Sequence, residues 1–304
     1  MIKGELEKIL GAGEVLLQQP MSQYTSFKVG GAAEHLVKPK DYNKVAEVIA
    51  FCSARDIPLY VLGRGTNLLV SDKGLPGVVI ALTDNLAKIT VAGVKIIAQA
   101  GAPLPKVSSV ALANKLTGLE FAGGIPGSMG GAVVMNAGAY DGEIKNVLRR
   151  VLAVNSQGEL VTFGPKEMEL AYRSSAFQHN GHVVLEAELE LAPGDPMAIQ
   201  AKMNEFNRRR REKQPLEAAS AGSTFKRPQG HYAGQLIESC NFRGTSLGGA
   251  AVSEKHCGFI INRGYATAQD IYNLILKVQG EVEKKHNVRL MPEVKIWGEF
   301  IEPR

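Results

Sequence analysis

The stretch Gly123-Gly124-Ile125-Pro126-Gly127-Ser128-Met129-Gly130-Gly131-Ala132 decides how the rest of the chain is interpreted. It holds five glycines and one proline in ten residues and runs into Met135-Asn136-Ala137-Gly138-Ala139-Tyr140. Glycine reaches backbone angles that other residues avoid, and it lets amide groups approach a ligand closely. A row of such amides forms a concave anion site that suits phosphates. The stretch therefore predicts a phosphate-bearing cofactor rather than a purely structural loop.

A second glycine turn follows the predicted short strand Leu59-Tyr60-Val61-Leu62, at Gly63-Arg64-Gly65-Thr66-Asn67-Leu68. Leu68 stands where the dinucleotide-binding fingerprint would have its third glycine, and the long glycine stretch does not fit that fingerprint either. The chain also contains no G-x-x-x-x-G-K-[ST] motif. If a phosphate binds at these turns, a fold other than the Rossmann or P-loop type must hold it.

Composition excludes several other classes of protein. The 304 residues can fold as two or more domains, and no apolar run approaches the ~20 residues of a membrane span. The N-terminus lacks the pattern of a signal peptide, so a cytoplasmic protein is expected. The three cysteines are far apart, which predicts buried reduced thiols, and no metal site is expected. Aromatic residues do not interleave with the basic run Arg208–Arg211, so nucleic-acid binding has little support.

Helices and strands alternate without a regular βαβ rhythm, which favours the α+β class. The predicted helices are at the N-terminus and at 41–55, 103–115, 197–213 and 268–286; the predicted strands are at 59–62, 77–82, 94–99, within 149–191 and at 294–300. Strict alternation makes Val183–Leu191 the clearest strand, half-solvated and antiparallel. The break Ala192-Pro193-Gly194-Asp195-Pro196 separates two predicted domains. The boundaries are 1–25 for an N-terminal helical segment, 26–193 for a cofactor domain and 197–304 for a substrate domain.

Six segments in order resemble one family over nearly the whole chain. They are Tyr24–Ala33, Leu62–Asp72, the glycine stretch through Tyr140, Ala171-Tyr172-Arg173-Ser174-Ser175, Ala221-Gly222-Ser223-Thr224-Phe225-Lys226-Arg227-Pro228 and Leu290-Met291-Pro292-Glu293-Val294. They are similar to the UDP-N-acetylenolpyruvoylglucosamine reductases, bacterial flavoenzymes that make UDP-N-acetylmuramic acid for peptidoglycan. The resemblance implies a bipartite FAD-binding region of the vanillyl-alcohol-oxidase (PCMH) type and a C-terminal α+β substrate domain. Some members carry a tyrosine-bearing insertion after Tyr-Arg-x-Ser; here the next strand follows Phe177 within six residues, so this chain resembles the subgroup without it.

The resemblance also implies the chemistry and three catalytic residues. FAD is held non-covalently and reduced by NADPH, which leaves before the substrate, UDP-N-acetylglucosamine enolpyruvate, enters. Arg173, which has no acidic neighbour in sequence, would stabilise the charge that develops on the substrate carboxylate. Glu293, if protonated by burial beside Met291, Pro292 and Val294, would donate a hydrogen bond to that carboxylate. Ser223 would give a proton to the carbanion, in a setting made positive by nearby lysine and arginine.

Two binding sets complete the expectation. The cofactor-binding residues are Gly63, Gly65, Thr66, Asn67, Leu68, Gly124, Ile125, Pro126, Gly127, Ser128, Gly130 and Asn136. Of these, Asn67, Ser128 and Asn136 could hydrogen-bond the pyrophosphate or the ring edges. The candidates for the UDP diphosphate are Arg210, Arg211, Gln214, Lys226, Arg227 and Asn241, with the assignment among them open.

Two alternatives stay open from the residues alone. The first is a related flavin oxidase that uses O₂ on an alcohol or amine. Many such enzymes tether the flavin through His or Cys, and neither central glycine turn contains one. The second is a basic sugar-nucleotide or nucleic-acid binding module without catalysis, which a yellow flavin-bearing preparation would exclude. A monomer or weak homo-oligomer is expected.

Overall fold

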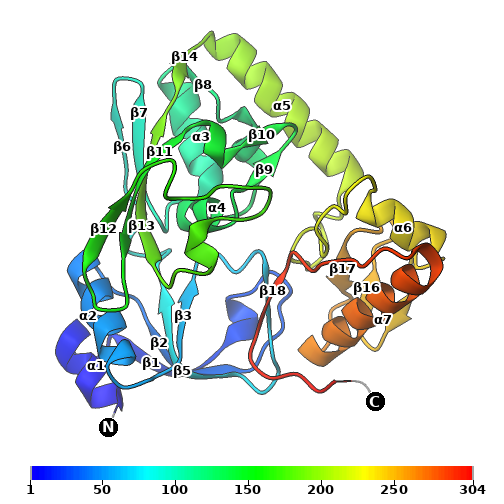
Figure 1. Ribbon diagram of the computed structural model, residues 1–304, viewed down its shortest axis with the longest axis horizontal. Helices are drawn as coiled ribbons and strands as arrows, with labels where there is room; N and C mark the ends of the chain where they lie inside the picture. The colour runs from blue at the N-terminus through cyan, green and yellow to red at the C-terminus, as the bar shows by residue number, and fades with distance from the viewer. Residues whose placement is uncertain (1, 303–304) are drawn as a thin grey trace. The chain divides into compact units, whose positions relative to one another are not determined.

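The computed structural model describes residues 2–302, and the chain forms two compact units (Figure 1). The first unit contains the residues up to Leu17, His35–Arg64 and Gly77–Arg210. The second contains Gln18–Glu34, Gly65–Pro76 and the chain from Arg211 onward. Both units are built from non-contiguous segments, whereas the domain boundaries predicted above follow the chain in order; those boundaries stay a prediction.

A five-stranded antiparallel sheet forms much of the first unit. Its order is β12 (Leu160–Phe163), β11 (Leu148–Val154), β13 (Val183–Glu190), β7 (Lys95–Gln99) and β6 (Ile89–Ala92). The predicted alternation in the central strand is confirmed, since Leu185, Ala187 and Leu189 are fully buried. On the opposite face Glu188 lies 2.8 Å from the ammonium of Lys95, and this contact lowers the pKa of Glu188.

Helices pack in this unit, and a side chain caps the N-terminus of two of them. They are α1 (Ile2–Leu10), α2 (Tyr42–Ser53), α3 (Leu104–Ala113), the short α4 (Met129–Val134) and α5 (Pro196–Lys213), which continues into the second unit. Asp41 caps α2 by accepting from the amide of Lys44 at 2.9 Å. Part of the glycine stretch forms a helix rather than a loop: Ser128 caps α4 and accepts from the amide of Gly131.

The chain also forms a four-stranded sheet and two short two-stranded ladders. A four-stranded sheet has the order β1 (Val15–Pro20), β2 (Ala32–Val37), β5 (Leu75–Ala81) and β3 (Leu59–Leu62), with β3 parallel to β5. Two small ladders join β8 (Leu116–Thr117) to β14 (Ala192–Pro193) and β9 (Gly138–Ala139) to β10 (Gly142–Glu143). The predicted break at Ala192–Pro196 is therefore partly a strand.

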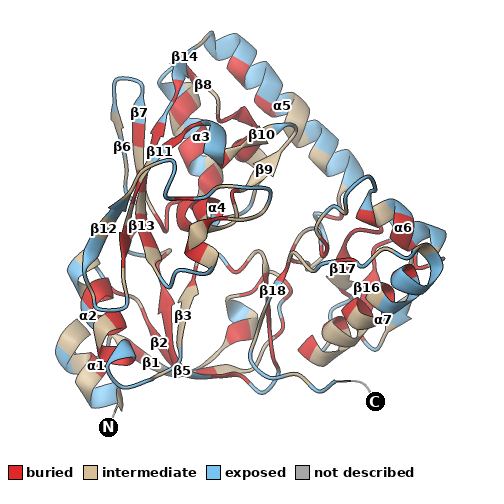
Figure 2. Cartoon of the chain, in the orientation of Figure 1, coloured by how far each residue is buried: buried red, intermediate tan, exposed pale blue. Residues whose placement is uncertain are grey.

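The second unit packs helices α6 (Ala233–Ser239) and α7 (Ala268–His286) with small sheets. One sheet has the order β15 (Ser246–Leu247), β16 (Ala250–Val252) and β17 (Ile260–Asn262); the other pairs β18 (Lys295–Trp297) in parallel with β4 (Leu68–Val70). The predicted span of α7 and its Thr267–Asp270 capping box are confirmed. Its predicted stripe of Ile271, Leu274, Ile275, Val278 and Val282 is buried (Figure 2).

Other predictions about composition have mixed outcomes. Cys52 and Cys257 are buried thiols as predicted, but Cys240 is only half-buried because it lies at the end of α6. No helix within residues 2–302 has the length and apolarity to cross a bilayer.

Candidate functional site

The turn between β3 and β4 has unpaired amides. The backbone of Gly65 is left-handed, with φ of +61°, and a Cβ there would lie 1.9 Å from the carbonyl oxygen of Tyr24. No protein group among residues 2–302 accepts a hydrogen bond from the amides of Gly65, Thr66 or Asn67. The turn therefore requires glycine at position 65 and leaves three consecutive donors for a ligand.

Packing explains much of the glycine in the long stretch. A Cβ on Gly130 would lie 2.8 Å from the Cβ of Ala100, and one on Gly124 would lie 2.6 Å from Oδ1 of Asn207 in α5. The amide of Gly130 donates to the carbonyl of Ala100 at 2.8 Å. The prediction that a continuous row of amides in this stretch is open to phosphate is therefore wrong at Gly130, where the protein itself uses the donor. Between Gly124 and Gly130, Ile125 is half-buried and Pro126 is exposed.

The two glycine turns meet at one side chain of the first unit. A Cβ on Gly63 would lie 2.6 Å from Oγ of Ser128, so only glycine allows the end of β3 to approach the start of α4 this closely. Ser128 is buried. Two residues predicted to bind the cofactor, Gly63 and Ser128, therefore lie in contact, and their cofactor role stays a prediction.

Arg210 reaches the glycine stretch from α5. Its Nη1 donates to the carbonyl of Gly124, and its Nε is buried with no hydrogen-bond partner among residues 2–302. Burial lowers the pKa of this guanidinium, and the hydroxyl of Tyr140 acts in the opposite direction. An arginine stays charged in proteins, so a cation is held against the predicted cofactor turn. The structure therefore associates Arg210 with that turn, in a different unit from Lys226 and Arg227, which were predicted to share its role.

Arg173 lies in a tight turn of the first unit. Ala171 and Ser174 exchange two backbone hydrogen bonds of 3.1 Å, and Arg173 between them has a left-handed φ of +52°. Its Nη2 donates to the carbonyl of Gly138 at 2.8 Å, and its guanidinium lies 5.1 Å from the centre of the Tyr172 ring. The sequence argument considered only acidic neighbours of Arg173, whereas the structure gives it a backbone carbonyl and an aromatic ring as partners.

The side chain of Asn136 has partners within the protein. Its side chain is fully buried; Nδ2 donates to the carbonyl of Ala171 at 2.9 Å and to Glu143 at 3.2 Å, while Oδ1 accepts from the amide of Lys145 at 2.9 Å. These protein partners use both amide hydrogens and one lone pair of the oxygen, so the side chain stabilises the fold here, and its contact with the cofactor stays a prediction.

In the second unit, Thr224 holds the segments of Ser223 and Glu293 side by side. The carbonyl of Thr224 accepts from the amide of Glu293 at 2.8 Å, and its amide donates to the carbonyl of Gly258 at 2.9 Å. Ser223 is exposed and Glu293 is half-buried. Asn67 joins the same group, because its Nδ2 donates to the carbonyl of Glu293 at 3.1 Å. Two predicted catalytic residues and one predicted cofactor residue therefore lie together.

Cations surround this group. The amide of Lys226 donates to the carbonyl of Met291 at 2.8 Å, which holds the segment of Ser223 beside that of Glu293. Burial and the charge of Lys226 together lower the pKa of Lys295. Sequence reasoning missed Lys295, although it is only two residues beyond Glu293. Arg227 lies 4.0 Å from the centre of the Tyr232 ring.

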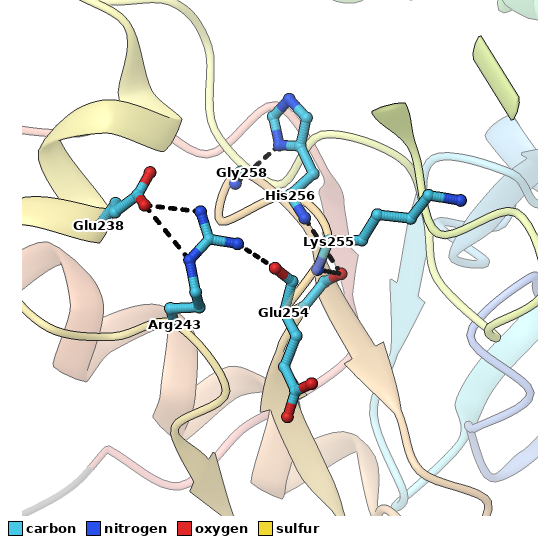
Figure 3. Close-up of polar contacts among 7 residues, drawn as sticks. Glu238, Arg243, Glu254, Lys255, His256 and Gly258 are labelled. Atoms are coloured by element: carbon cyan, nitrogen blue, oxygen red, sulfur yellow. Dashed lines mark hydrogen bonds and ion pairs between the residues drawn. The ribbon is translucent and has the colours of Figure 1, made fainter. Parts of the chain in front are cut away.

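Sequence reasoning also missed the loop between β16 and β17, whose Phe259 forms an isolated bridge with Ser223. Figure 3 shows the polar contacts of this loop. The guanidinium of Arg243 contacts Glu238 at 2.6 Å and donates to the carbonyl of Glu254. In the same loop Nδ1 of His256 accepts from the amide of Gly258 at 3.0 Å, so its neutral ring carries the proton on Nε2. Burial, together with the nearby charges of Arg243 and Lys213, lowers the pKa of His256.

The other substrate candidates lie at the edges of this region. The carbonyl of Arg211 accepts from Nζ of Lys255 at 2.7 Å, and Gln214 is half-buried just beyond α5. Asn241 is exposed with a left-handed φ of +62° at the end of α6, a conformation that Asn adopts readily after a helix. The backbone conformation alone therefore explains why an asparagine occupies position 241.

Comparison with known proteins assigns the family. Residues 33–164 match the model of an FAD binding domain, and residues 214–297 match the C-terminal domain of UDP-N-acetylenolpyruvoylglucosamine reductase. The reductase of that name from Clostridium kluyveri is 50% identical over 295 residues, which is 97% of each chain. The chain belongs to the UDP-N-acetylenolpyruvoylglucosamine reductase family. A relative of the same name from Caldanaerobacter subterraneus is also 50% identical over 97% of each chain.

Solved structures agree with this membership. The reductase of this family from Thermus caldophilus has a TM-score of 0.81 at 33% identity, covering 94% of this chain and 98% of that one. The glucose dehydrogenase Phl p 4.0202 has a TM-score of 0.50 at 14% identity, over 64% of this chain and 44% of that one, which shows a shared fold alone. The predicted α+β class with an FAD-binding domain is confirmed.

Proposed function

We propose that Arg173, Ser223 and Glu293 carry the reaction of this FAD-containing oxidoreductase. The reaction is the NADPH-dependent reduction of UDP-N-acetylglucosamine enolpyruvate to UDP-N-acetylmuramate, a step of peptidoglycan precursor synthesis. The observation that carries the assignment is a pair of backbone hydrogen bonds, from the amide of Glu293 to the carbonyl of Thr224 and from the amide of Lys226 to the carbonyl of Met291. They hold the segments of Ser223 and Glu293 side by side.

The residues present fit an anionic, flavin-bearing cofactor. The three unpaired amides from Gly65 to Asn67 can receive pyrophosphate oxygens, and the guanidinium of Arg210 supplies positive charge beside Gly124. FAD held there would supply the hydride chemistry that links NADPH to the methylene carbon of the substrate. The chain itself has to orient the substrate, stabilise the new charge and supply a proton.

Arg173 is assigned to the charge that develops on the substrate carboxylate. Its guanidinium stays charged and presents a planar fork, and one arm, Nη2, is already fixed by the carbonyl of Gly138 at 2.8 Å. A prearranged donor stabilises developing charge without the cost of reorganising at the moment of reaction. Glu293, in its protonated form, would donate a second hydrogen bond to the same carboxylate.

Ser223 is assigned as the proton donor to the carbon next to the carboxylate. A serine hydroxyl is a weak acid, so this role requires a strongly basic acceptor and a positive environment. The exposed Ser223 is three residues before Lys226 in the same segment, and the charge of Lys226 acts on Lys295. These two cations, with Arg227, are the best-placed candidates for the substrate diphosphate in the second unit; Arg211 and Gln214 are retained as secondary candidates.

The domain division is proposed on the same basis. Residues 26–193 would form the FAD-binding domain and residues 197–304 the substrate domain, after an N-terminal helical segment at 1–25. The family matches at 33–164 and 214–297 each fall within one of these ranges. The cytoplasmic location, the lack of a nucleic-acid partner and the monomeric or weakly oligomeric state stay predictions.

Rapid mixing of Arg173→Ala and Ser223→Ala holoenzymes tests the assignment. Each variant is first reduced anaerobically with NADPH and then mixed with the enolpyruvyl substrate. Both should take up reducing equivalents from NADPH at the wild-type rate, because neither residue is assigned to that step. Both should then form UDP-N-acetylmuramate at least 100-fold more slowly, as expected for the loss of a charge-stabilising or proton-donating group. Normal product formation by either variant would refute its role.

A further inference from the structure

Arg173 occupies a backbone conformation that the turn alone does not favour. A left-handed φ such as its +52° is uncommon for a residue with a side chain and persists only where surrounding contacts impose it. Three contacts of the first unit surround this residue. Asn136 holds the carbonyl of Ala171 at 2.9 Å, Gln178 holds the carbonyl of Arg173 itself at 3.1 Å, and Gly138 accepts from Nη2 at 2.8 Å.

We infer that Asn136 is a positioning residue that sets the guanidinium of Arg173 for the substrate carboxylate. The inference rests on the role proposed for Arg173. Asn136 and the acceptor Gly138 are two residues apart, so one short segment holds both the entry to the turn and the far end of the arginine side chain. The Asn136 side chain is itself immobilised, because it is fully buried and also bonded to Glu143 and to the amide of Lys145. A displaced Asn136 would leave the carbonyl of Ala171 held by the amide of Ser174 alone, which loosens the turn and lets the arginine fork turn away.

Binding measurements on the oxidised holoenzyme separate positioning from a general structural role. UDP-N-acetylmuramate carries the carboxylate that Arg173 would contact, whereas UDP-N-acetylglucosamine carries the same nucleotide and sugar without it. The variant is Asn136→Gly, because glycine tolerates the left-handed φ of +40° at this position and only the side chain is lost. The matched control is Glu143→Gln, which keeps an acceptor for Asn136 and leaves the contact with Ala171 intact.

We expect Asn136→Gly to raise the Kd of UDP-N-acetylmuramate about tenfold, the loss of roughly one hydrogen bond to a charged group, with the Kd of UDP-N-acetylglucosamine unchanged. In an Arg173→Ala background the same substitution should add nothing, since the group it positions is gone. Equal weakening of both ligands, a full effect in the Arg173→Ala background, or an equal effect of Glu143→Gln would overturn the inference. If Arg173→Ala itself leaves UDP-N-acetylmuramate binding unchanged, the proposed function of Arg173 fails instead.

Discussion

The substitution Gly65→Ala is expected to weaken FAD binding by distorting the turn between β3 and β4. A Cβ at this position would lie 1.9 Å from the carbonyl oxygen of Tyr24. Close carbon–oxygen contacts settle near 3.3 Å, so the turn would have to move by about 1.4 Å. The left-handed φ of +61° adds about 1–2 kcal/mol for any residue other than glycine. Because the displaced amides are the proposed pyrophosphate donors, the Kd of FAD should rise at least about tenfold, or about 1.4 kcal/mol.

Gly93→Ala provides the matched control for this prediction. Gly93 has the same φ of +61°, lies in the turn between β6 and β7, and a Cβ there would meet no heavy atom within 4 Å. Gly93→Ala therefore has the same cost of a left-handed backbone as Gly65→Ala, but its new Cβ collides with no other atom. Titration of each apoprotein with FAD, followed by flavin fluorescence, gives the two affinities, and denaturant unfolding gives the two stabilities. Wild-type FAD affinity in Gly65→Ala, or an equal loss in Gly93→Ala, would refute the assignment of this turn.

Three further predictions concern catalysis, helix capping and thiol chemistry. Glu293→Ala should leave reduction by NADPH unchanged and slow product formation from the reduced enzyme at least tenfold, as a lost hydrogen bond to developing charge would do; rapid mixing measures both. Asp72→Ala should lower the free energy of unfolding by about 1–2 kcal/mol in a denaturant titration, since its carboxylate accepts from the first two amides of α7 at 2.9 and 3.0 Å. Burial raises the pKa of Cys52 to about 11, so folded protein binds the thiol proton more tightly and stability should fall as pH rises from about 9 to 11. A Cys52→Ala variant should lose that slope, and an alkylating reagent at pH 8 should modify the half-buried Cys240 well before Cys52.

Local patterns predicted the elements that local chemistry determines. The capping box and apolar stripe of α7, the Asp41 cap of α2 and the alternating strand β13 all follow from residues close together in sequence. The helix α4 was missed because glycine has a poor helix propensity, and its conformation depends on contacts such as that between Gly130 and Ala100. The two-residue strands were missed because they are too short to show a period.

In the candidate site, too, the sequence indicated individual residues but not the contacts between distant parts of the chain. Family motifs indicated Ser223 and Glu293, but their pairing depends on backbone hydrogen bonds between residues almost seventy positions apart, which spacing cannot reveal. Asn136 was assigned by its residue type to a ligand, whereas its amide is used by Ala171 and Glu143. An asparagine in sequence carries no signal that distinguishes these two uses. Lys295 was missed although it is only two residues beyond Glu293 and falls within the predicted strand 294–300.

The most direct test of the central claim is an absorbance measurement on wild-type holoenzyme without oxygen. The account predicts that NADPH bleaches the bound flavin and that UDP-N-acetylglucosamine enolpyruvate then restores the oxidised spectrum, with one UDP-N-acetylmuramate formed per flavin reoxidised. A flavin that stays bleached with this substrate and recovers only when oxygen is admitted would contradict the account and favour an oxidase.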